Sequence, residues 1–161
     1  FALRDQEVFM ARDYVVRLMK IKCSMGTVEN YLNVDIDHGI FVGSDQQPLM
    51  NANDHTDKNI MPFGNCLSPQ NPDRCLRQAL VKGTIGALTC GIGGIVSDAV
   101  SGALESAGIM TYKCKPNTPN PWEFVNEKSI VDGAPALMVE SKLTCRYGGV
   151  ISIIYEPISN L

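Results

Sequence analysis

The chain has 161 residues and a mass of 17.6 kDa, and 45% of its residues are hydrophobic, which is enough for one domain with a buried core. Its formal charge of -3 and isoelectric point near 5.3 lack the basic excess of nucleic-acid-binding proteins, so nucleic acid is excluded as an expected partner. The start of the chain is charged within five residues and has no apolar run after it, so we expect a cytoplasmic protein without a Sec signal peptide.

The first third of the chain predicts short strands. Lys20, Ile21 and Lys22 alternate as a half-buried strand does within the apolar stretch Val15–Cys23. Further strand-like pieces lie at Tyr31–Val34, Ile40–Val42 and Pro48–Met50, each cut by Asn, Asp or Gly. The polar residues 51–58 then predict a solvated loop.

The middle of the chain predicts helix. Asn71-Pro72-Asp73 carries a stop signal and an N-cap signal, so Asp73 is expected to cap a helix running on through residues 75–81. Residues 83–108 are almost entirely small and apolar, which suggests either a membrane span or a closely packed helical hairpin. The apolar run before Asp98 is shorter than the roughly 20 residues a bilayer requires, so the hairpin is preferred and membrane contact is expected to be only transient.

The last third predicts strands again. A β-pattern resumes in Met110–Cys114 and leads into a Pro-rich corner, where Trp122 is expected to act as an anchor. Asp132-Gly133 and Gly148-Gly149 each lie between two apolar runs and predict two consecutive hairpins. The fold class is therefore mainly β, built of short strands and hairpins, with a helical insertion near residues 72–108.

The expected organisation is one domain with two short flanking segments. Residues 1–14 are interpreted as an N-terminal extension or linker, residues 15–155 as the domain with its helical insertion at 73–108, and residues 156–161 as a C-terminal tail. The insertion is the expected docking segment for a cargo or partner, because small-residue apolar helices are too hydrophobic to stand alone in water.

Four of the six cysteines lie at corners of the chain, beside Gly or Pro: Cys23, Cys66, Cys114 and Cys145. Because strands reverse at such corners, thiols distant in the sequence could meet at one end of a compact β-structure. That arrangement would build a metal site or a pair of disulfides. The other two, Cys75 and Cys90, fall in the predicted helices and are expected to be core residues.

A set of motifs in order along residues 20–153 resembles the PAAR-like family of bacterial injection systems. The motifs are Lys22-Cys-Ser-Met-Gly26, Asn59-Ile-Met-Pro-Phe-Gly-Asn-Cys66, Ser68-Pro-Gln-Asn-Pro72, Cys114-Lys-Pro116, Pro121-Trp122, Gly133-Ala-Pro-Ala-Leu137 and Ser141-Lys-Leu-Thr-Cys-Arg-Tyr-Gly-Gly-Val-Ile-Ser-Ile153. The resemblance implies a small conical β-domain that caps the trimeric, valine-glycine-repeat spike of a contractile injection (type VI secretion-like) system and carries an effector. It implies delivery by that apparatus and a structural role rather than an enzymatic one.

The resemblance also implies a metal near the point, commonly held by His and Cys. Only His38 and His55 occur, both in polar segments expected to face solvent, so a three-histidine site cannot be assembled. Four thiolates suit a tetrahedral structural zinc, and Cys23, Cys66, Cys114 and Cys145 are the predicted ligands because they lie in the family's cysteine-bearing motifs. No C-x-x-C pair is present, and two disulfides or simple packing are the alternatives.

Two other kinds of chemistry have partial motifs in the chain. Asp35-Ile-Asp37 resembles the start of a calcium loop, but the later acidic ligands are missing, so a solvated turn is expected. A cysteine-dependent hydrolase or toxin would require His38 or His55 to serve a nucleophile such as Cys66. No nucleophile-elbow or cysteine-protease signature accompanies these residues. The hydrolase or toxin is therefore kept as the alternative to the structural role.

Overall fold

The computed structural model describes residues 13–42, 46–74 and 111–155. These residues form a mainly β fold of short strands and hairpins, which confirms the predicted fold class. The strands are β1 (Lys20–Cys23), β2 (Asn30–Tyr31), β3 (Phe41–Val42), β4 (Gln47–Pro48), β5 (Asn126–Val131), β6 (Ala134–Ala136), β7 (Lys142–Thr144) and β8 (Val150–Ile153).

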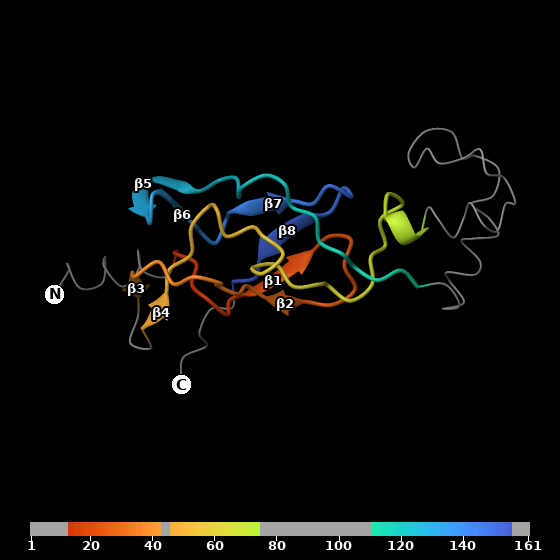
Figure 1. Cartoon of the computed structure of the whole chain (residues 1–161), viewed down its shortest axis with the longest axis horizontal. Coiled ribbons are helices and arrows are strands. Elements are labelled where there is room, and N and C mark those ends of the chain that lie inside the picture. Colours follow the sequence, from red (N-terminus) through yellow and green to blue (C-terminus); the bar gives the residue numbers. More distant parts are fainter. Residues whose placement is uncertain (1–12, 43–45, 75–110, 156–161) are drawn as a thin grey trace, which may run out of the picture.

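The largest sheet joins the two ends of the described chain. Its strand order is β2-β1-β8-β7, all antiparallel, with Ile21 opposite Ile153 and Cys23 opposite Ile151 at its centre. Figure 1 shows this sheet in the middle of an elongated molecule, with β3 to β6 toward one end and the helical turn at residues 72–74 toward the other. Strand β1 therefore pairs with β2, close by in the sequence, and with β8, the last strand in the described residues.

The core lies against this sheet and is assembled from every described part of the chain. Alternation along β8 buries Ile151 and Ile153 while Val150 remains 42% exposed, as period-two patterning requires. The fully or nearly buried members of the cluster are Val15, Ile21, Leu32, Met50, Ile60, Phe63, Trp122, Leu137, Leu143, Ile151 and Ile153. Trp122 donates its indole Nε1–H to the carbonyl of Asp54 at 2.9 Å, which confirms the predicted corner anchor.

Both predicted C-terminal hairpins are present. Asp132 and Gly133 connect β5 to β6 with φ values of 48° and 77°, the paired left-handed conformation that suits a two-residue hairpin turn. The β7–β8 connection is longer than the expected two residues, because β7 ends at Thr144 and β8 begins at Val150. Within it Gly148 has φ 83° and donates its N–H to the carbonyl of Cys145.

Two predicted elements in the first half differ from the structure. The stretch Val15–Cys23 is not one strand, because Leu18 adopts φ 68° and interrupts it, leaving Lys20–Cys23 as β1. The segment 51–58 is not uniformly solvated: Asn51 and Asp54 are only 1% and 6% exposed. Both are buried with partners, since Asp54 accepts the N–H of Asn51 and the Asn51 amide donates to Val131.

The helix at the start of the predicted insertion begins two residues earlier than predicted. The helical turn covers residues 72–74, and Asn71 Oδ1 accepts the backbone N–H groups of Asp73 and Arg74. Asn71 is therefore the N-cap and Pro72 the first helical residue, a position where proline is favoured because its missing N–H needs no partner. The Asp73 carboxylate instead pairs with Lys115 Nζ at 3.0 Å.

Several predicted features fall outside the described residues. These are most of the 1–14 extension, the 156–161 tail, the predicted helices from residue 75 onward, and Cys75 and Cys90. Of the described extension residues, Tyr14 pairs with Met138 and Asp13 accepts the N–H of Val139, so β contacts extend past the predicted boundary at residue 15. None of the helices in the described residues is of a length and hydrophobicity that could span a membrane.

Candidate metal centre

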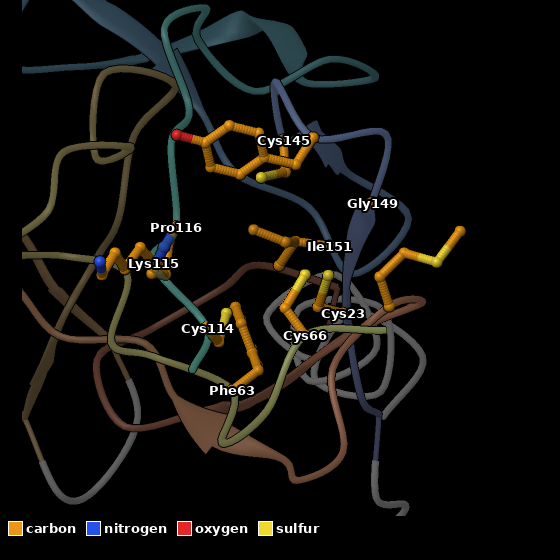
Figure 2. Close-up of a pocket in the computed structure, with 11 residues that line it drawn as sticks. Cys23, Phe63, Cys66, Cys114, Lys115, Pro116, Cys145, Gly149 and Ile151 are labelled. Carbon is orange, nitrogen blue, oxygen red and sulfur yellow. The ribbon is translucent and has the colours of Figure 1, made fainter. Parts of the chain in front are cut away.

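The four predicted cysteines line a single cavity. Cys23 ends β1, Cys145 directly follows β7, and Cys66 and Cys114 lie in two irregular segments that flank the sheet. The cavity has a volume of about 10 Å³ and a largely apolar lining that also includes Phe63 and Ile151. Figure 2 shows the four cysteine side chains arranged around Ile151 in this view.

Backbone hydrogen bonds hold each corner beside the next one. Cys66 donates its N–H to the carbonyl of Tyr112 at 2.7 Å, and Cys114 donates to Gly64 at 2.8 Å, which ties the second and third corners together. Gly26, in the first corner, forms a β-bridge with Cys66. Cys145 donates to Gly149 at 2.8 Å and closes its own turn. The positions of the cysteines are therefore set by main-chain pairing.

Glycine allows the first and fourth corners to approach closely. A β-carbon at Gly149 would lie 2.6 Å from the sulfur of Cys23, and one at Gly26 would lie 2.5 Å from the β-carbon of Phe63. Real β-carbons do not approach other atoms so closely, so only glycine fits at either position without a shift of its neighbours. Sequence reasoning used these glycines only as markers of turns.

Cys23 and Cys114 lie in an environment that favours the neutral thiol unless a cation is present. Burial raises the pKa of Cys23 and, in the same way, that of Cys114, and the neighbouring cysteines add to the effect. The backbone groups of Met25 and Gly26 near Cys23, and of Phe63 near Cys114, partly offset this rise and lower the pKa. A bound cation would offset the burial and favour the thiolate form.

The donor set fits a closed tetrahedral metal site in kind and number. Cys23, Cys66, Cys114 and Cys145 are all free thiols, and thiolate sulfur is the ligand that zinc prefers in structural sites. As placed, the described side chains contain no group of three or more His, Cys, Asp or Glu that forms a ready metal site. Coordination would therefore require the four sulfurs to move closer together, from the cavity wall that they share with Ile151.

The histidines lie elsewhere, and the expectation that both face solvent is wrong for His38. Its side chain is only 10% exposed and contacts the carboxylates of Asp54 and Asp132. His55 is half-buried and its Nδ1 lies 2.7 Å from the carbonyl of Thr118. Neither ring lines the cysteine cavity, so no His–Cys pair of the kind needed for a hydrolase is formed among the residues described.

Comparison with known proteins gives one result. The family described as "Domain of unknown function (DUF4280)" matches residues 15–157, nearly the whole chain. The chain belongs to this family. No curated protein and no solved structure matches it. The matched range covers all eight strands and all four cavity cysteines, so the candidate metal centre lies within the DUF4280 domain.

Proposed function

We propose that this DUF4280 domain is a structural, metal-clamped tip protein. In this proposal it caps the trimeric spike of a contractile injection system and links an effector to it. The observation that carries the proposal is the convergence of Cys23, Cys66, Cys114 and Cys145, distant in the sequence, on one small apolar cavity. The PAAR-like resemblance of the motifs that bear these cysteines supplies the spike as partner.

A metal-dependent tip is reasonable on energetic grounds. The strands are two to six residues long, and strands of this length with few partners are weak on their own. A structural zinc held by thiolates contributes on the order of 10–16 kcal/mol to folding of a small peptide domain at neutral pH. In this domain the four cysteines would hold the ion at the cavity that they line.

The decisive experiment for the metal is elemental analysis combined with thiol counting, on protein purified without reductant or chelator. We expect about one zinc per chain, released as four of the six thiols react. Changing any one of the cavity cysteines to Ser should abolish stoichiometric zinc, whereas Cys90→Ser serves as the control and should retain it. Six free thiols without metal, or two disulfides, would contradict a zinc clamp.

The tip role requires a separate test. The purified domain, mixed with a trimeric valine-glycine-repeat spike protein from the same genome, should elute with it in size-exclusion chromatography at one domain per trimer. Light scattering gives the stoichiometry directly. Absence of a complex, under conditions where the domain retains its metal, would refute the proposed binding to the spike. It would not count against the metal site.

The alternative of a cysteine-dependent hydrolase or toxin lacks support from the geometry. A nucleophilic cysteine such as Cys66 needs a nearby base, and neither His38 nor His55 lines the cavity that holds Cys66. The hydrolase alternative would be supported if changing one cavity cysteine removed a hydrolytic activity and left the zinc content unchanged.

A further inference from the structure

His38 lies between two carboxylates far from the cysteine cavity. Its Nδ1 is 3.0 Å from Asp132 Oδ2, and its Nε2 is 3.0 Å and 3.1 Å from the two carboxylate oxygens of Asp54. The three residues come from separate parts of the chain: a loop before β3, the buried 51–54 turn, and the β5–β6 turn. We call this group the His38 clamp.

The contacts of His38 determine the protonation state of its imidazole ring. An ionised carboxylate can only accept hydrogen bonds, and a neutral imidazole carries only one N–H. Two carboxylate contacts through two ring nitrogens are both satisfied only when the ring is doubly protonated. We propose that His38 is an imidazolium that fastens the loop before β3 to the 51–54 and β5–β6 turns, and that its deprotonation releases that loop.

The two acceptors differ in how firmly they are held. Asp54 is buried, its carboxylate also accepts the Asn51 N–H at 2.8 Å, and its carbonyl accepts the indole N–H of Trp122. Asp132 is 63% exposed at its side chain and lies in a two-residue turn. The Asp54 half of the clamp is therefore anchored in the core, and the loop that carries His38 is the part free to detach.

The other charges on the loop already have their own partners. Asp35 pairs with Lys58 at 2.8 Å, and Asp37 accepts the N–H of Gly39. The charged groups facing the ring are thus Asp54 from the 51–54 turn and Asp132 from the β5–β6 turn. The loop carries Ile36 and Ile40, and Phe41 follows it at the start of β3. These side chains are 40–71% exposed, so the clamp fixes how they are presented.

The direction of the pH effect follows from these contacts. Burial alone would lower the pKa of His38, but the hydrogen bonds to Asp132 and Asp54 outweigh it, so the pKa lies above its ordinary value near 6.5. A folded pKa above the unfolded one means that the stabilisation is complete below about pH 6.5 and is lost as the pH rises through the folded value. While both carboxylates are ionised, the clamp is closed below about pH 6.5 and opens as the pH rises through the pKa of His38.

The first test is an NMR titration of the histidine ring carbons in the intact chain. We expect the His38 ring to titrate at a higher pH than histidine in the urea-unfolded protein. We also expect the amides of residues 35–42 to lose protection once the ring is neutral, after correction for base-catalysed intrinsic exchange. Titration at or below the unfolded value would overturn the proposal. So would protection factors that stay constant across the transition.

Variants supply a second, independent test. His38→Gln should lower the melting temperature by about 2–4 °C at pH 6 and by less at pH 9, since the clamp is already open there. Asp132→Asn should move the His38 titration downward, and Asn tolerates the left-handed backbone at this position. His55→Gln is the control and should leave the His38 titration unchanged, because the His55 ring bonds to the carbonyl of Thr118 and to neither carboxylate of the clamp. Equal pH profiles for wild-type and His38→Gln would refute the clamp.

Discussion

Gly149 lies directly against the sulfur of Cys23, since a β-carbon at this glycine would stand 2.6 Å from that atom. We therefore expect Gly149→Ala to push the Cys23 thiol out of place and to destabilise the domain by about 1–3 kcal/mol, the usual range for overpacking. Zinc content should fall with it if the cysteines bind metal as proposed. Elemental analysis and denaturant unfolding measure the two effects.

The control for this substitution is Gly133→Ala. Gly133 has no atom within 4 Å of its would-be β-carbon, but its φ of 77° strains any L-residue. That variant should lose some stability and keep its zinc. Equal zinc content in both variants would show that the Gly149 contact has no bearing on the metal centre.

Ile151 connects the core to the cysteine cavity, because it is fully buried in β8 and also lines that cavity. Ile151→Ala should cost about 2–5 kcal/mol of unfolding free energy, as truncation of a buried aliphatic side chain does. Val150→Ala on the same strand, at a 42% exposed position, should cost little. Urea unfolding of the two variants gives the comparison, and similar losses would mean that β8 does not bury the face assigned to it.

Asn71 is expected to contribute more to stability than Asp73, although the sequence suggested Asp73 as the cap. Asn71→Ala removes the acceptor for the N–H groups of Asp73 and Arg74 and a side-chain bond to Lys113, so a loss of about 1–2 kcal/mol is expected. Asp73→Ala removes an exposed ion pair with Lys115, which is worth at most about 1 kcal/mol. A larger drop in melting temperature for Asp73→Ala than for Asn71→Ala would show that Asp73 is the cap.

The stability of the domain should depend on the indole N–H of Trp122 as well as on the size of its ring. Trp122→Phe keeps an aromatic ring in the core but removes the donor to the Asp54 carbonyl, leaving a buried acceptor unpaired at a cost of about 1–3 kcal/mol. Phe124→Leu, two residues along at a 69% exposed position, is the control and should change stability little. Indistinguishable melting temperatures for the two variants would argue against the Trp122–Asp54 bond.

Much of the local structure could be predicted from the sequence because it depends on near neighbours. The Asp132-Gly133 hairpin follows from the tolerance of these two residues for positive φ, and the alternation in β8 follows from the period of a strand. The corner positions of the four cysteines were also visible as Cys beside Gly or Pro. No such local signal indicated that Leu18 would interrupt the first strand.

Tertiary structure alone decided the features that depend on partners distant in the chain. Polar character predicted that His38 and Asp54 would be solvated, but Asp54 is buried and His38 half-buried, because each, together with Asp132 and Asn51, satisfies the hydrogen bonds of the other. Likewise the sequence placed four thiols at corners, while the pairing of β1 with β8 and the bridge between Gly26 and Cys66 brought those corners to one cavity. Turn chemistry is local and readable in a sequence, whereas burial of a polar group depends on partners that only the folded chain brings near.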